Sequence, residues 1–125
     1  MSRQTRSTGA SEAPESGASV RARLAAIARE TALEVPGVLR ADRDHLGAYL
    51  TRSTGGELLD GVNASAAADG GYAVSLRLVA ALVPLHPLGK LIAERVRSAA
   101  AEAGLGAELE SLSIQFTDVE DGAAI

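Results

Sequence analysis

The sequence predicts a two-layer α+β fold, in which two helices cover one face of a single three- to four-stranded mixed sheet. Two stretches, near residues 19–35 and 88–103, carry apolar side chains at helical spacing. Other segments alternate apolar and polar side chains as strands do, most clearly at 72–83 and 109–119. A chain of 125 residues has room for one such domain and a tail.

The first element expected is a disordered tail over residues 1–18, where Ser, Thr, Gly, Ala and charged residues leave little apolar surface to bury. A helix should follow, with Ser19 as its N-cap and Pro36-Gly37 ending it. The α+β domain is then predicted to span 19–121, with a loose C-terminal tail at 122–125. The apolar stripe of this helix includes Val20, Leu24, Ile27 and Val35.

The strands of the sheet are expected in the middle of the chain. Residues 38–42 form a candidate short strand, and 46–50 are its continuation or its partner. A Gly-, Ser- and Thr-rich stretch at 51–61 predicts a loop, and 62–67 predicts a modest strand. Asp69-Gly70-Gly71 predicts the turn of a hairpin. The strand after it, 72–83, is the clearest in the sequence and is expected to be central, with Tyr72, Val74, Leu76, Leu78, Ala80 and Leu82 on one face.

The last two elements complete the domain. Pro84-Leu85-His86-Pro87 predicts a break after the long strand, and a helix should run from Leu88 to a C-terminal cap at Gly104. The final strand, 109–119, places Leu112, Ile114 and Phe116 on one side. A strand–helix–strand crossover would make this strand parallel to 72–83 if the two are neighbours.

Two clusters contain residue types that occur in chemical sites. Asp42-Arg43-Asp44-His45 has the ligands of a hard-metal or acid–base site, but strand alternation would point His45 away from both carboxylates, and Arg43 would compete for them. A solvated strand end is the preferred interpretation. His86 lies beside a predicted helix start, yet neither a cysteine nor a nucleophile-elbow serine accompanies it. The sequence therefore predicts no catalytic, cofactor-binding or metal-binding residues, and no enzyme.

Composition narrows the partner classes. A net charge of −4 and a pI near 5.1 disfavour a nucleic-acid-binding protein, since such proteins cluster basic residues against phosphates. The absence of cysteine removes disulfides and thiolate metal sites. An apolar run long enough for a membrane span, or an export signal, is also lacking. These features favour a cytoplasmic protein that binds other protein.

Candidate partner-binding residues lie in three places. Glu30 and Glu34 are like charges near a helix C-terminus. They either complement charges on a partner or are simply tolerated at the surface. The sheet face away from the helices is predicted to lack charge, which favours self-association over solvation by Arg77 and the flanking loops. With the proline-bracketed loop, the candidates on and beside that face are Val79, Ala81, Val83, Leu85, His86, Ser113 and Gln115.

Five segments in order carry a family resemblance: Ile27 to Val38 with its Val-Pro-Gly-Val end, Gly61-Val-Asn-Ala, Tyr72 to Val79, Ile92-Ala-Glu-Arg-Val96, and Leu112 to Val119. Over roughly residues 20–121 the chain resembles the alkaline shock protein 23 family, also called the Gls general-stress family. The resemblance implies a bacterial, non-enzymatic, self-associating cytoplasmic protein of the envelope stress response, held at the membrane in some members by a small membrane-anchored partner.

The chain also departs from that family pattern. It has the proline-bracketed Leu85-His86 segment where many members have a Gly-containing loop, and its strand at Val62 is alanine-rich. A second function therefore stays open, that of an adaptor that modulates a metabolic or cell-envelope enzyme through protein binding. Both functions need a protein partner, and neither requires a cofactor, nucleic acid or direct insertion into a membrane.

Overall fold

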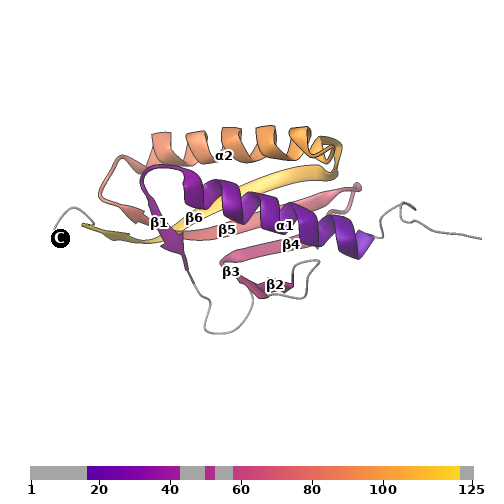
Figure 1. Cartoon of the computed structure of the whole chain (residues 1–125), viewed down its shortest axis with the longest axis horizontal. Helices are drawn as coiled ribbons and strands as arrows, with labels where there is room; N and C mark the ends of the chain where they lie inside the picture. Colours follow the sequence, from indigo (N-terminus) through magenta and orange to yellow (C-terminus); the bar gives the residue numbers. More distant parts are fainter. Residues whose placement is uncertain (1–16, 43–49, 53–57, 122–125) are drawn as a thin grey trace, which may run out of the picture.

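The computed structural model describes residues 17–42, 50–52 and 58–121. It confirms the predicted α+β class: helices α1 and α2 lie on one face of the main sheet (Figure 1). The elements in order are α1 (Gly17–Glu34), β1 (Val38–Ala41), β2 (Leu50–Arg52), β3 (Leu58–Asp60), β4 (Val62–Ala66), β5 (Tyr72–Ala81), α2 (Leu85–Glu102), a 3-10 turn η1 (Gly106–Glu108) and β6 (Leu109–Glu120).

Strand β5 is the centre of the main sheet, as predicted. One side pairs antiparallel with β4 near its start, where Val62 is opposite Leu76, and with β1 near its end, where Val38 is opposite Ala80. Among the described strands, β6 is the one that pairs with the other side of β5, in parallel. Strands β4 and β1 thus follow one another along one side of β5, and the expected parallel crossover through α2 is confirmed.

A second sheet of two strands corrects the prediction of a loop over 51–61. Strands β2 and β3 pair antiparallel there, and Arg29 Nε of α1 donates a hydrogen bond of 2.8 Å to the carbonyl oxygen of Asp60. Gly61 then joins β3 to β4 with a φ of +75°, where an added Cβ would lie 2.7 Å from Ala41 Cβ and 2.9 Å from the Arg77 carbonyl oxygen. This junction therefore requires glycine.

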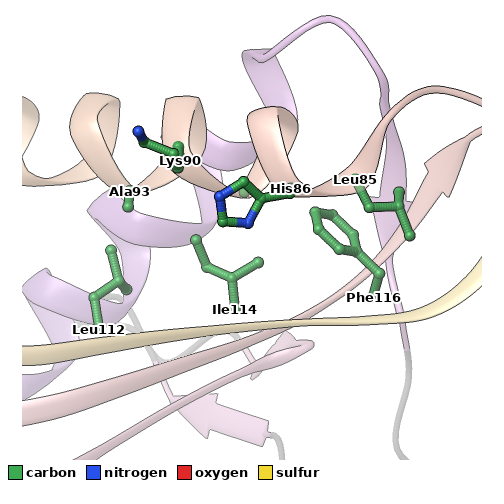
Figure 2. A pocket seen from close by; sticks show the side chains of 8 residues that line it. Leu85, His86, Lys90, Ala93, Leu112, Ile114 and Phe116 are labelled. Carbon is green, nitrogen blue, oxygen red and sulfur yellow. The ribbon is translucent and has the colours of Figure 1, made fainter.

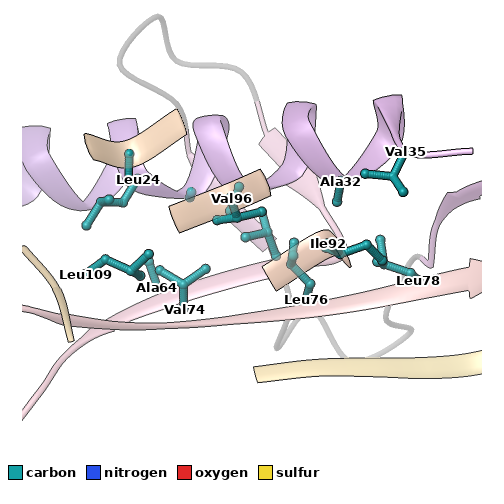
Figure 3. Packing of buried hydrophobic residues seen from close by; sticks show 14 of the residues in the cluster. Leu24, Ala32, Val35, Ala64, Val74, Leu76, Leu78, Ile92, Val96 and Leu109 are labelled. Atoms are coloured by element: carbon teal, nitrogen blue, oxygen red, sulfur yellow. The ribbon is translucent and has the colours of Figure 1, made fainter. Parts of the chain in front are cut away.

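The core fills the space between the helices and the sheet (Figure 3). Helix α1 contributes mainly alanine, with Ala25, Ala28 and Ala32 at most 1% exposed. Small side chains let a helix lie close to the sheet, so the aromatic-poor composition is accommodated by short distances rather than by bulk. The other core positions come chiefly from β5 (Val74, Leu76, Leu78, Ala80) and α2 (Leu88, Ile92, Val96, Ala100).

Helix and strand boundaries differ from the predicted ones. Helix α1 begins at Gly17, so Ser19 lies inside the helix instead of capping it. Helix α2 begins at Leu85 with Pro84 as its N-cap, so His86 and Pro87 belong to its first turn rather than to a loop. Proline is tolerated in this turn because the N–H that it lacks would have no partner within the helix. Strand β5 ends at Ala81, two residues before the predicted end.

The predicted turn signals are confirmed where the structure describes them. Gly70 and Gly71 have φ values of +99° and +72° in the connection from β4 to β5. Helix α2 ends at Glu102, and Gly104 after it has a φ of +79°. Most of the candidate strand at 46–50, residues 1–16 of the tail predicted over 1–18, and the predicted tail at 122–125 lie outside the described residues. Residues 17 and 18 belong to α1 instead of the predicted tail.

Candidate partner-binding surface

Strand β6 lies at an edge of the main sheet. Its pairing with β5 uses one side of its backbone, and no strand in the described part of the chain pairs with the other side. The strand is long, running from Leu109 to Glu120. An edge of this kind presents N–H and carbonyl groups that can pair with another polypeptide.

Both ends of β6 have features that disfavour pairing with another strand, and its middle has none. Glu110 lies near the start, Asp118 and Glu120 lie near the end, and the register with β5 shifts close to both positions. Charged side chains and bulges of this type disfavour edge-to-edge pairing. Between them, residues 111–117 carry no charge. The open part of the edge is therefore a central segment of β6.

An apolar groove runs between this central segment and helix α2. Leu112, Ile114 and Phe116 of β6 point toward the helix and are only partly buried (Figure 2). The opposite wall comes from the first half of α2, and the groove has a volume of 460 Å³. We call it the α2–β6 groove; its α2 lining is Leu85, His86, Gly89, Lys90 and Ala93.

The charges of the α2–β6 groove have one sign. Lys90 and His86 line it, and none of the eight lining residues is acidic. Arg97 follows Lys90 by seven residues, which places it on the same side of α2. The groove therefore combines an apolar floor with a basic rim, although the whole chain is acidic.

The sheet face away from the helices is uncharged in one part and charged in another. Ser113 and Gln115 of β6 are exposed there, as predicted. The prediction of a charge-free face is wrong at the other end, where Arg40 donates hydrogen bonds of 3.0 and 2.5 Å to the two carboxylate oxygens of Glu120. Arg77 lies between the two parts, with its guanidinium 3.7 Å from the Asp42 carboxylate.

The Arg40–Glu120 pair joins β1 to β6 across the central strand. The register places Arg40 beside Val79 on one side, and Asp118 beside Val79 on the other. The hydrogen bonds from Arg40, followed by the attraction of its charge, lower the pKa of Glu120, and the same contacts raise the pKa of Arg40. Val79 is only 2% exposed at this crossing, which corrects its expected role as a contact residue.

The remaining predicted contact residues do not form one site. Glu30 and Glu34 are exposed on α1, and Ser113 and Gln115 lie on the open sheet face. Val83 is 38% exposed just after β5, whereas Ala81 is partly buried. Leu85 and His86 are the two that line the α2–β6 groove.

The sequence interpretation missed most of the groove. Leu112, Ile114 and Phe116 were expected on one side of their strand, but nothing in their spacing shows that the helix above leaves them partly uncovered. The sequence pattern predicts no binding role for Gly89, Lys90 or Ala93. An interior helix glycine was the available signal, because glycine inside a helix costs stability and needs a reason.

The described residues give no support to a metal site. They contain no group of three or more His, Cys, Asp or Glu side chains that could hold an ion. Asp42 pairs with Arg77, while Asp44 and His45 of the same predicted cluster lie outside the described residues. Neither α1 nor α2, the two helices described, combines the length and hydrophobicity needed to cross a membrane.

Comparison with known proteins assigns no family. No family model matches the chain, and no curated protein matches it. Among solved structures, a double variant of MamM CTD has a TM-score of 0.46 at 18% identity, covering 80% of this chain and 94% of that one. The copper form of MamM CTD has a TM-score of 0.45 at 18% identity, with 80% and 87% covered. Similarity at this level carries neither a family nor a function to this protein.

Proposed function

We propose that this protein is a non-enzymatic protein-binding module of the bacterial envelope stress response: a cytoplasmic scaffold that self-associates and docks on a membrane-anchored partner. The resemblance of five segments, in their order along the chain, to the alkaline shock protein 23 family supports the cellular role. One structural observation carries the binding role. The uncharged middle of the β6 edge runs beside a partly uncovered apolar groove, which is the arrangement that a protein partner completes.

Self-association is assigned to the uncharged part of the open sheet face. Ser65 of β4 and Ser111, Ser113 and Gln115 of β6 are exposed there. Hydroxyl and amide side chains cost less to remove from water than charged groups, and they can hydrogen-bond across an interface. A flat face of this composition suits contact with the same face of a second copy, as in a twofold dimer.

Light scattering after size exclusion tests this contact. We expect the wild-type chain to elute as an oligomer at tens of micromolar, and Ser113→Lys to shift it to monomers, because the substitution places two ammonium groups at a twofold interface. Ser98→Lys is the matched control, since Ser98 is exposed on α2, away from the sheet. A strictly monomeric wild-type protein would rule out the self-association part of the proposal.

The adaptor function remains a second candidate, and the α2–β6 groove is the observation that favours it. A groove that accepts a segment of another protein serves an adaptor as well as a scaffold. Affinity purification from a native bacterial lysate separates the two. Recovery of an integral membrane protein favours the scaffold, and recovery of one enzyme in fixed ratio favours the adaptor.

A further inference from the structure

We propose that the α2–β6 groove binds an extended segment of a partner protein, with apolar and acidic side chains together on the face that points to α2, which adds to β6 as a further strand. This inference rests on the proposed function, because it names the partner chemistry for that same surface. Three observations carry it: the open backbone edge, the basic rim of an apolar groove, and a glycine that keeps the groove open.

The backbone of β6 supplies the first contact. Its uncharged middle segment offers N–H and carbonyl groups to an incoming strand, as in other cases of strand addition. Side chains of the added strand would alternate between the two faces of the sheet. Every second one would therefore point to the helix side and enter the groove beside Leu112, Ile114 and Phe116. At 460 Å³ the groove is within the size range of ligand pockets.

The positive charge at the rim of the groove favours a segment that carries negative charge. Lys90 and His86 line the groove without an acidic neighbour among the lining residues. A carboxylate at one helix-facing position of the added strand can accept hydrogen bonds from the Lys90 ammonium, while apolar side chains two residues away on the same face cover the floor. Lys90 is exposed, so its charge acts on specificity and association rate more than on affinity.

A second copy of this chain is a poorer occupant of the same edge. Antiparallel pairing of two β6 strands centred on Ile114 would place Glu110 opposite the Asp118 of the other copy, twice. Parallel pairing in register would place each acidic residue beside its own equivalent. Like charges directly opposite one another are destabilising in either case. The acidic residues at the ends of β6 thus favour a different polypeptide, rather than a second copy, as the added strand.

Gly89 supports a binding role for the groove. It lies inside α2, where glycine is less favourable than alanine by roughly 0.5–1 kcal/mol. A Cβ at this position would meet the Phe116 ring at 3.7 Å, an ordinary contact distance. Folding alone would therefore accept alanine and gain from it. What glycine preserves is open space above Phe116.

The test uses the full chain and designed peptides of about eight residues, long enough to span the open segment. All carry threonine at every second position. The positions between them share one face of an added strand, and they hold leucine except for one, which holds aspartate, lysine or threonine. Fluorescence anisotropy should show the aspartate peptide binding most tightly and the lysine peptide least. Lys90→Glu should reverse this order, whereas Arg95→Glu, which makes the same charge change on an exposed part of α2 outside the groove, should preserve it.

A second variant tests the groove itself. Gly89→Leu should abolish peptide binding by filling the space over Phe116, while circular dichroism and the melting temperature show that the domain is still folded. Equal binding of the aspartate and lysine peptides, binding of neither, or unchanged binding by a folded Gly89→Leu variant would each overturn the inference.

Light scattering on the same variants separates this inference from the proposed self-association. If Gly89→Leu and Lys90→Glu convert an oligomer to monomers, a second copy occupies the groove, and the inference fails while self-association stands. If the wild-type chain is a monomer that binds the aspartate peptide, self-association fails and the inference stands.

Discussion

The two helices cover the same sheet to different degrees. Under α1, three core alanines at most 1% exposed bring the helix close to the strands, and the β2–β3 hairpin is tied to that helix by Arg29 and Asp60. Under α2, the buried stripe is complete on the inner side, but Ile114 and Phe116 of β6 remain partly exposed. On the α1 side, which we call the closed side, the inward side chains of the helix are covered. On the α2 side, the domain ends in a groove and an open strand edge.

This difference shows how a small two-layer domain can keep a binding surface without losing its core. Apolar area that is fully covered stabilises the fold. Apolar area that stays partly exposed can still be buried by a partner, and its burial then stabilises the complex. The closed side must therefore carry most of the stability. The open side should tolerate substitutions that the closed side does not.

The largest expected effect follows directly from this comparison. Leu24→Ala removes a side chain of α1 that is 2% exposed in the core, and it should lower the free energy of unfolding by about 2–5 kcal/mol. Ile114→Ala removes a partly exposed side chain from the groove and should cost clearly less, because the site is already open to water. Urea denaturation of both variants measures the difference. Equal losses would mean that the groove side is as closed as the α1 side.

A backbone substitution on the closed side should come next. Gly61→Ala combines a positive φ with a Cβ placed within 3 Å of two neighbouring atoms, so it should cost about 2 kcal/mol or more. Gly70→Ala is the matched control: its φ is also positive, but a Cβ there would meet nothing within 4 Å. Thermal unfolding should show a larger loss for Gly61→Ala. Similar losses would show that the crowded junction adapts without strain.

The closed side is also the part that the sequence predicts best. Alternation along residues 72–83 indicates which side chains of β5 enter the core, and Val74, Leu76, Leu78 and Ala80 are indeed buried. The parallel strand after α2 follows from the same pattern and from crossover geometry. These features depend on periodicity, which is visible in a single sequence.

The features that sequence reasoning missed depend on short elements or on tertiary placement. Three-residue strands such as β2 and β3 are too short to show alternation, and their Gly- and Ser-rich connection predicts a loop. Pro87 concealed the true start of α2, because proline is as acceptable in a first helical turn as in a loop. The groove depends on how far α2 lies from β6, a distance that side-chain spacing does not encode.

A smaller effect of opposite sign tests the open side. Gly89→Ala should raise the free energy of unfolding by roughly 0.5–1 kcal/mol, because alanine favours the helix and its Cβ makes an ordinary contact with Phe116. Urea denaturation measures the change, and Gly106→Ala is the control, since a Cβ there would press against Ala101 at 3.3 Å. A loss of stability in Gly89→Ala would mean that the groove has less room than its geometry indicates.

The smallest effect concerns the ion pair that joins the ends of β1 and β6. Arg40 lowers the pKa of Glu120 in the folded protein, so the pair stabilises the fold above the unfolded-state pKa of about 4.3 and loses that contribution as the pH falls through the lower folded-state value. Both side chains are exposed, so water and salt screen the pair. Near neutral pH, Glu120→Gln should therefore change stability very little.

Acid unfolding is the measurement that isolates this pair. Melting temperatures recorded from pH 7 to pH 3 should fall less steeply for Glu120→Gln than for the wild-type chain below about pH 4.3. Glu102→Gln serves as the control, because Glu102 is exposed at the end of α2, away from Arg40. Identical slopes for the wild-type and Glu120→Gln proteins would show that the ends of β1 and β6 are held by backbone pairing with β5 alone. The Arg40–Glu120 pair would then disfavour edge-to-edge pairing of the sheet without stabilising the fold.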